Sequence, residues 1–267
     1  MSKRLIINSD DYGRSPDISR GIRESHLRGV VTSTTCMMNI PTTAADISVA
    51  LRETPKLGLG VHLVLTAENP VLPRDQLKTI TNEDGSFLKL AVLLSKLDQI
   101  DVSEVKAEWR AQIEAFIKAA GRNPTHLDSH HHSSFFSPAL FRGMLELAKE
   151  YDCAIRFPFT NNISSELKET FKEGPSLLNE FSPRHPDIFI VDFYDEQATQ
   201  EILLSIINNL KDGSTEIMCH PGYVDDAFAK ESSYNSQRET ELKILTDSAI
   251  KQAIQAQDIE LITFENL

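Results

Sequence analysis

Histidine and aspartate residues are concentrated in two short segments of the chain. The segment PTHLDSHHH contains Asp128 and His130, and NSDDYG contains Asp10 and Asp11. Imidazoles and carboxylates bind divalent cations, and two histidines with one carboxylate leave a coordination position open for water or substrate. The two segments therefore predict a catalytic metal site rather than a structural one.

The adjacent carboxylates Asp10 and Asp11 follow an apolar run and precede Gly13. Because Asp and Gly are common turn residues, an isolated pair of this kind is typical of a turn. Two carboxylates at a strand end can also divide the work, one binding a cation and the other accepting a proton. Their like charges make this arrangement costly unless a metal or hydrogen-bond donors offset them. The histidine-containing segments favour the second interpretation.

Two further histidines lie in strand-like segments. His62, in GLGVHLVLT, is by itself more typical of a buried core histidine than of a ligand. His220 directly precedes Pro221 and Gly222, whose turn is expected to leave the imidazole at the rim of a site. Because histidine titrates near neutral pH, His220 suits protonation of a leaving group, and a histidine that caps a strand is the alternative.

The strand period of two places Asp128, His130 and His132 on one face of THLDSHHH. His130 is therefore the best second imidazole ligand, and His131 and His132 are expected to support it. Asp128 is predicted to accept the free ring N–H of a ligand histidine. Arg156, in CAIRFP, is predicted to hold a substrate anion or a catalytic carboxylate.

Short runs rich in Ile, Val, Leu and Phe alternate with longer amphipathic patterns, which is typical of βα units around a parallel sheet. Helices are predicted at residues 102–120, 138–151, 196–210 and 236–257. Strands are predicted at residues 5–8, 31–38, 59–65, 125–129, 154–157, 189–193, 216–219 and 260–264.

This alternation continues along all 267 residues, without a low-complexity linker or a repeat of fixed period. We therefore expect one domain over residues 1–267, an α/β fold that forms a single irregular (β/α) TIM-like barrel of parallel strands. The polar clusters fall at the C-terminal ends of the predicted strands, where such barrels have their active sites. The irregular stretches 67–87 and 161–186 are predicted to fold over the site as lids.

Composition limits the classes of function. The chain is 40% hydrophobic and 25% charged, and its net charge of −12 argues against an extended nucleic-acid surface. No apolar run approaches the roughly 20 residues of a membrane helix, and no signal-peptide pattern is evident, so we expect a cytoplasmic protein without membrane contacts. Three widely spaced cysteines, expected to be free and buried, indicate neither a disulfide framework nor a thiolate zinc site.

The motifs NSDDYG, GVHLVLT, THLDSHHH and MCHPG, in this order, resemble the YdjC-like family of carbohydrate deacetylases, and VVTSTT and QRETELKILT are also similar. The resemblance implies an irregular (β/α) barrel with one divalent ion, Mg²⁺ or Zn²⁺. It further implies removal of the N-acetyl group from a small amino sugar, such as the chitooligosaccharide diacetylchitobiose with or without a 6-phosphate, and release of acetate. A homodimer is expected by the same resemblance.

The resemblance also assigns roles to residues. It places the metal on Asp11, His62 and His130, the general base on Asp10 and the general acid on His220, with the choice of base between the two aspartates left open. Two other classes remain open: a non-haem iron oxygenase, which also uses two histidines and one carboxylate, and a non-catalytic sugar-binding protein on the same scaffold. The residues expected to contact substrate or to support the site are Asp128, His132, Arg156 and Tyr223.

Overall fold

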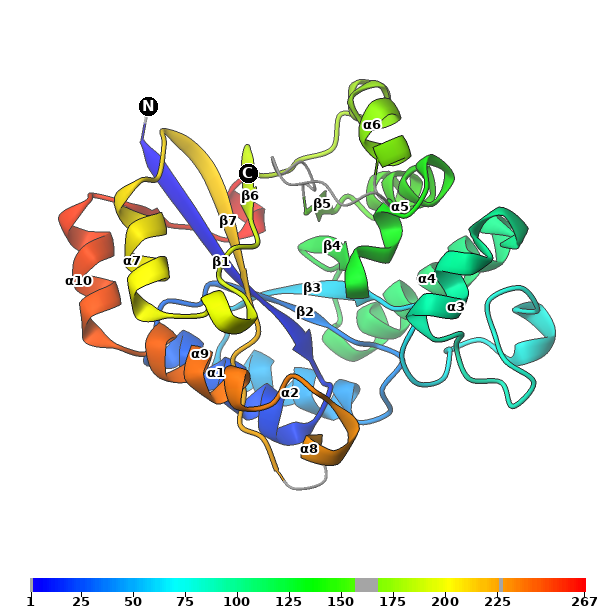
Figure 1. The fold of residues 1–267 in the computed structure, drawn as a ribbon, viewed down its shortest axis with the longest axis horizontal. Helices are drawn as coiled ribbons and strands as arrows, with labels where there is room; N and C mark the ends of the chain where they lie inside the picture. Colours follow the sequence, from blue (N-terminus) through cyan, green and yellow to red (C-terminus); the bar gives the residue numbers. More distant parts are fainter. Residues whose placement is uncertain (1, 157–167, 226–227) are drawn as a thin grey trace.

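The computed structural model describes residues 2–156, 168–225 and 228–267. Its centre is one curled eight-stranded sheet with the order β5-β4-β3-β2-β1-β7-β6, and β8 pairs with β1 (Figure 1). Every ladder between these strands is parallel, which confirms the predicted α/β class. The strands are β1 (Lys3–Tyr12), β2 (Ser33–Cys36), β3 (Gly58–Leu63), β4 (His126–Ser129), β5 (Ala154–Ile155), β6 (Ile188–Ile190), β7 (Gly213–Cys219) and β8 (Glu260–Leu261).

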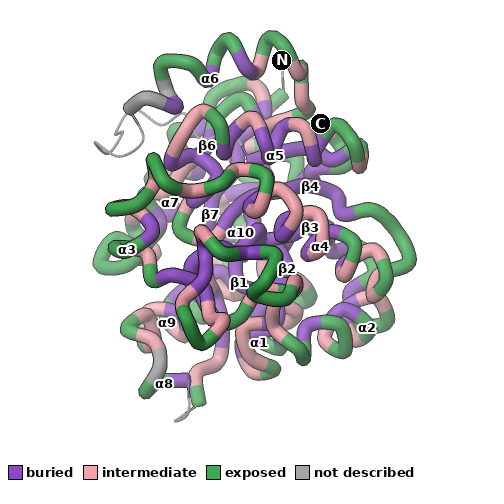
Figure 2. Tube along the Cα trace, turned by 90° about the vertical axis from the view of Figure 1, so that its right-hand side faces the viewer, coloured by how far each residue is buried: buried purple, intermediate pink, exposed green. Residues whose placement is uncertain are grey.

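The helices surround this sheet, and burial is concentrated along the strands while the outer helix faces are exposed (Figure 2). The predicted helix over 236–257 is wrong in one respect: it is two helices, because the Asp247 carboxylate accepts the Ala249 N–H and starts a new one. The helices are α1 (Pro16–Leu27), α2 (Thr43–Glu53), α3 (Leu90–Ser95), α4 (Val102–Ala120), α5 (Pro138–Glu150), α6 (Lys168–Phe181), α7 (Gln200–Asn208), α8 (Phe228–Glu231), α9 (Ser236–Leu245) and α10 (Ser248–Ala256).

The barrel is open between β5 and β6, the two edges of the sheet. Within the described residues these strands form no ladder with each other, and they contain only two and three residues. Short edge strands offer few unpaired backbone groups, so little is gained by pairing them. The fold is therefore a half-barrel of the TIM-like type rather than a closed ring.

Strand β1 lies in the middle of the sheet and is buried from Leu5 to Tyr12. It pairs with β7 through residues 3–9 and with β2 from Asn8 onward. A run of Leu, Ile and Ile suits a parallel strand that is covered on both faces. Because all strands are parallel, the carboxyl ends of β1, β3, β4 and β7 meet at one edge of the sheet, where the polar motifs lie.

The stretch 67–87, predicted to be a lid, is an ordered insertion that packs against α4. The Glu108 carboxylate of α4 accepts the backbone N–H groups of Val71 and Leu72, each at 2.9 Å. Glu104, one turn earlier on the same helix, accepts both the N–H and the hydroxyl of Thr79 at 2.7 Å. Two buried or half-buried carboxylates thus attach the insertion to α4, and its role as a lid stays a prediction.

The second predicted lid, 161–186, is only partly described. Residues 161–167 lie outside the described residues, and the remainder contains helix α6, which the sequence analysis did not predict. In the described part of the chain the three cysteines are free and buried, as expected. No helix there combines the length and the apolar character needed to cross a bilayer.

Candidate metal centre and active site

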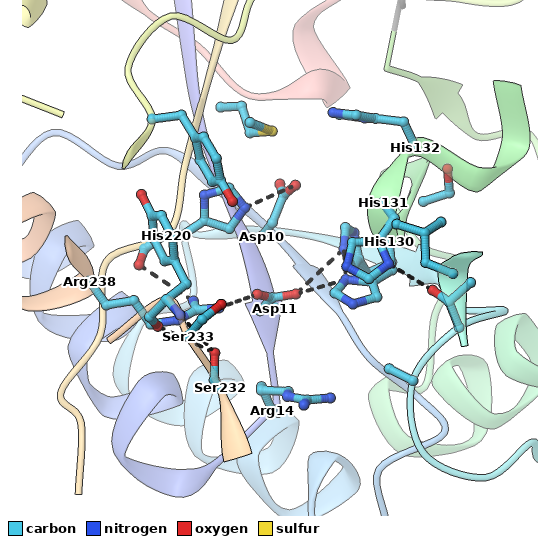
Figure 3. Close-up of a pocket in the computed structure, with 18 of the residues that line it drawn as sticks. Asp10, Asp11, Arg14, His130, His131, His132, His220, Ser232, Ser233 and Arg238 are labelled. Atoms are coloured by element: carbon cyan, nitrogen blue, oxygen red, sulfur yellow. Dashed lines mark hydrogen bonds and ion pairs between the residues drawn. The ribbon is translucent and has the colours of Figure 1, made fainter. Parts of the chain in front are cut away.

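A pocket of about 750 Å³ opens at the carboxyl edge of the sheet. This size lies within the range of about 300–1,000 Å³ typical of small-molecule sites. In Figure 3, Asp10 and Asp11 lie in the middle of the pocket, with His220 on one side and His130 on the other. The pocket therefore brings together residues from β1, from the segment after β4 and from the end of β7.

A bulge in β1 turns both aspartates toward this pocket. Adjacent residues of a regular strand point to opposite faces, so only one of them would reach it. The register between β1 and β2 shifts between Ser9 and Tyr12, and Asp11 adopts a left-handed φ of 70°. Such bulges re-aim side chains next to functional sites. Both Asp10 and Asp11 consequently line the pocket.

Three ligand atoms face one another at the predicted metal site. Asp11 Oδ1 lies 3.5 Å from His62 Nε2 and 3.4 Å from His130 Nδ1, and the two imidazole nitrogens are 3.3 Å apart. Two atoms that each lie about 2.1 Å from a tetrahedral ion are separated by about 3.4 Å. Asp11, His62 and His130 therefore have the spacing of ligands around a shared ion.

The hydrogen bonding of Asp11 also fits a cation. Its Oδ2 accepts a 2.5 Å hydrogen bond from the Arg238 guanidinium. Its Oδ1 is buried and has beside it only the two imidazole nitrogens, at 3.4 and 3.5 Å, neither of which makes a well-formed hydrogen bond to it. A buried carboxylate oxygen without a well-formed hydrogen bond is costly, and a metal ion would satisfy it.

Asp128 fixes the orientation of the His62 ring. Its Oδ1 lies 2.7 Å from His62 Nδ1, so that Nε2 is directed toward Asp11 and His130. The other oxygen of Asp128 accepts from the Thr35 hydroxyl at 3.0 Å and pairs with Arg156 at 2.9 Å. Asp128 thus makes the contact with a histidine ring that was predicted for it, an arrangement that commonly supports a metal-binding imidazole.

The electrostatics predict that metal binding releases a proton from His62. Burial alone would lower the pKa of His62, but the carboxylates of Asp128, Asp10 and Asp11 outweigh burial and raise it to about 9. At pH 7 the ring is thus protonated, and a bound ion must displace that proton. We expect affinity to strengthen about tenfold per pH unit between pH 6 and 7.5, with about one proton released. Titration calorimetry in buffers of different ionisation enthalpy measures this number, and a value near zero at pH 7 contradicts it.

Replacing Asp128 with asparagine is expected to weaken metal binding about 10- to 100-fold while the fold persists, since the carboxylate that orients His62 is lost. The metal affinities of wild type and variant are compared after correction for protonation of His62, because the substitution also lowers the pKa of that residue. Thr35→Val is the matched control: it removes one donor to Asp128 but keeps the Asp128–His62 contact, and we expect a smaller change. Equal affinities for wild type and Asp128→Asn would exclude this role.

Asp10 is held by a buried arginine. Arg156 donates from Nη1 to Asp10 Oδ2 at 2.8 Å and from Nη2 to Oδ1 at 2.6 Å, and Asn8 donates to Oδ1 at 3.0 Å. Burial alone would raise the pKa of Asp10, but the Arg156 guanidinium outweighs burial and holds it below its usual range. Arg156 is itself fully buried and also bonds Glu216. Arg156 therefore holds the Asp10 carboxylate, and whether that carboxylate is catalytic stays a prediction.

Asp10, His62 and Asp128 form a second group with metal-ligand spacing. The carboxylates of this group are already occupied, since Asp10 is clamped by Arg156 on both oxygens and Asp128 is bonded to His62, Thr35 and Arg156. Asp11 by contrast has a buried oxygen without a well-formed hydrogen bond, facing the nitrogens of His62 and His130. The group of Asp11, His62 and His130 is therefore the better metal site.

His220 follows β7 and lines the pocket beside Asp10. Its Nε2 lies 3.8 Å from Asp10 Oδ2, and its backbone N–H donates to the Glu241 carboxylate. Burial lowers the pKa of His220 to about 4, although Asp10 and Asp11 act in the opposite direction. The imidazole is thus neutral at pH 7 in the metal-free protein and lies beside Asp10, slightly beyond hydrogen-bond distance.

The prediction that the strand period of two extends to His132 is wrong, because strand β4 ends at Ser129. His131 and His132 have left-handed φ angles of 54° and 57°, which turn the chain. His132 nevertheless lines the pocket, with its ring centroid 6.1 Å from that of Phe189. His131 Nδ1 lies 2.9 Å from the Thr66 hydroxyl, at the start of the insertion.

Tyr223 is not among the residues that line the pocket, although it was predicted to support substrate binding. Its hydroxyl donates to Glu24 at 2.6 Å and its ring packs against the Arg20 guanidinium, 4.1 Å from the ring centroid. Both partners belong to α1. The turn after Pro221 and Gly222 directs this side chain to the outer helix instead.

Several site residues were missed by sequence reasoning. Arg238 and Glu241 both belong to the segment QRETELKILT. This segment is similar to the family, but the sequence analysis assigned no role to any of its residues. The spacing of three between Arg238 and Glu241 places them on one face of helix α9, which points toward Asp11 and His220. Asn8 belongs to the motif NSDDYG but was given no role, and Glu216 carries no signal beyond its position within a strand.

The chain matches one protein family over most of its length. The family model described as YdjC-like protein matches residues 4–256. A carbohydrate deacetylase of Brevibacillus brevis is 38% identical and covers 99% of each chain. A chitooligosaccharide deacetylase of Salmonella paratyphi B is 35% identical and covers 95% of each.

Solved structures agree with this match. A crystal structure from Enterococcus faecalis V583 superposes with a TM-score of 0.88 at 34% identity, covering 100% of this chain and 99% of the other. The Xyl-CE4 domain of a xylanase from the hindgut metagenome of Trinervitermes trinervoides gives a TM-score of 0.50 at 9% identity, covering 98% of this chain and 88% of the other, and so shows a shared fold alone. These comparisons confirm the family that the motifs indicated: the chain belongs to the YdjC-like protein family.

Proposed function

We propose that this chain is a metal-dependent carbohydrate deacetylase that hydrolyses the acetamide of an N-acetylated amino sugar and releases acetate. The observation that carries the proposal is the meeting, in one pocket, of three facing ligand atoms with the clamped carboxylate of Asp10 and the imidazole of His220. Relatives named carbohydrate deacetylase and chitooligosaccharide deacetylase support a sugar as the substrate.

Asp11, His62 and His130 would hold the divalent ion. When bound there, it supplies polarisation of the acetyl carbonyl and a lowered pKa for a water molecule. Of the two ions proposed, the imidazole pair favours Zn²⁺, because Mg²⁺ prefers oxygen ligands. Arg238 occupies the second oxygen of Asp11, so this carboxylate offers a single oxygen to the ion. Coordination positions are thereby left for water and substrate.

Asp10 and His220 supply the proton transfers. Asp11 is committed to the ion, so Asp10 is the carboxylate that remains to accept a proton from the attacking water. Because Arg156 makes Asp10 a weak base, the proton passes on to the neutral His220, whose Nε2 lies 3.8 Å away. The resulting imidazolium protonates the departing nitrogen, a step that amines require to leave.

The pocket volume of about 750 Å³ is of the size that takes small molecules, and we propose diacetylchitobiose, with or without a 6-phosphate, as the substrate. The test measures acetate release from N-acetylglucosamine and diacetylchitobiose, with and without 6-phosphate. Each assay uses the chelated protein and the same protein after addition of Zn²⁺ or Mg²⁺. We expect metal-dependent acetate release from at least one disaccharide.

The alternatives give different outcomes in the same assay. Turnover that requires oxygen and yields no acetate would indicate the iron oxygenase. Sugar binding without acetate release under any metal would indicate a sugar-binding protein on this scaffold. A homodimer and a cytoplasmic location remain predictions, to be tested by analytical ultracentrifugation and by cell fractionation.

A further inference from the structure

The aromatic ring of Tyr194, which lines the pocket, is partly exposed to solvent. Tyr194 lines the pocket and is 43% exposed, one of the few large hydrophobic residues at the surface of the described chain. Its ring is stacked on that of Tyr234, with centroids 4.7 Å apart and planes inclined by 6°. Since Tyr234 covers one face of Tyr194, the exposed surface belongs to the opposite face and the ring edge.

The backbone holds Tyr194 in this position. The next residue, Asp195, has a left-handed φ of 53°, which is uncommon for a residue other than glycine. Its N–H donates to the Tyr234 hydroxyl at 3.1 Å, and its carboxylate accepts from Gln237 of α9 at 2.9 Å. Strain of this kind persists where surrounding contacts impose it, and it often marks a binding site.

A single buried carboxylate connects this ring pair to His220. Glu241 accepts the Tyr234 hydroxyl with one oxygen and the His220 backbone N–H with the other. The ring of His220 meets Tyr194 and Tyr234 edge-on, at centroid distances of 5.4 and 5.5 Å. The exposed face of Tyr194 is therefore fixed relative to the imidazole that protonates the leaving nitrogen.

We propose that Tyr194 forms a carbohydrate subsite, on which the pyranose ring that carries the departing nitrogen stacks. This inference rests on the proposed function, since the leaving group of the deacetylation is the amino sugar and must lie beside His220. The C–H groups on one face of a pyranose form an apolar surface that matches an exposed aromatic face. Tyr194 thus selects a sugar ring as the leaving group and orients its nitrogen.

The test compares Tyr194→Ala with Tyr194→Phe, which keeps the ring and loses only the hydroxyl. For diacetylchitobiose we expect KM to rise about tenfold in Tyr194→Ala, with a smaller change in kcat, and to stay near the wild-type value in Tyr194→Phe. Tyr151→Ala, at the end of α5 and outside the pocket, is the matched control for loss of a tyrosine. An equal defect in Ala and Phe variants, or a kcat defect at unchanged KM, would overturn the stacking role.

A second measurement separates this inference from the proposed function. Saturation-transfer NMR records the binding of diacetylchitobiose to metal-free protein, where no turnover occurs. We expect binding in wild type and Tyr194→Phe, and about tenfold weaker binding in Tyr194→Ala. If the sugar binds in a way that depends on Tyr194 but no acetate is released, the deacetylase proposal is wrong and the subsite proposal stands. Binding that is equal in wild type and Tyr194→Ala, or absent from wild type, defeats the subsite.

Discussion

His220→Ala is expected to lower kcat by about 10²- to 10⁴-fold while metal binding stays unchanged. The imidazole lies beside Asp10 and is not among the residues whose atoms have metal-ligand spacing, so we expect its loss to remove proton transfer without removing a ligand. Steady-state kinetics with diacetylchitobiose and metal titration of the same preparation measure the two quantities. Loss of metal in parallel with turnover would show that His220 is a ligand instead.

Comparing substrates that have different leaving groups tests whether His220 acts as the proton donor. An aryl acetate departs as a phenolate that needs no protonation, so the defect of His220→Ala should be much smaller on this substrate than on the acetamide. His220→Gln keeps a hydrogen-bond donor but cannot carry a proton, and we expect it to behave like the alanine variant. A fully active His220→Gln enzyme would indicate that the residue only donates a hydrogen bond.

The strands, and the positions of the four motifs at strand ends, were predictable because both depend on local sequence patterns. Apolar runs mark the buried strands, and parallel strands bring their carboxyl ends to one edge, so Asp11, His62 and His130 were expected to converge. The observed spacing of 3.3–3.5 Å between their ligand atoms agrees with that expectation. The position of each motif at a strand end was therefore sufficient to identify a common site.

The parts that were missed depend on contacts distant in sequence or on backbone distortion. The bulge that turns both Asp10 and Asp11 into the pocket has no signature in NSDDYG beyond a turn pattern. Arg238 reaches Asp11 across 227 positions of sequence, and an arginine on an amphipathic helix ordinarily faces solvent. The order of the insertion 67–87 likewise depends on the carboxylate of Glu108, which helical periodicity alone does not assign to a loop.

Asp11→Asn is expected to abolish functional metal binding and to reduce turnover to the level of chelated wild type. Asparagine has a neutral oxygen, which is a poor ligand compared with a carboxylate. The substitution is chosen over alanine because the amide oxygen can still accept from Arg238. Removing that acceptor entirely would leave a buried charge unpaired, at a cost of about 3–5 kcal/mol. Asp17→Asn, on the exposed side of α1, is the matched control.

Thermal unfolding gives a readout of Asp11→Asn that does not require activity. An ion present at 100 times its Kd stabilises the wild-type fold by about 2.7 kcal/mol, and the Tm rises accordingly. We expect this metal-dependent rise in Asp17→Asn and its absence in Asp11→Asn. A rise that persists in Asp11→Asn but disappears in Asp10→Asn would place the ion on Asp10, His62 and Asp128 instead. Asp11 would then be free to act as the base, and the roles of the two adjacent aspartates would be exchanged.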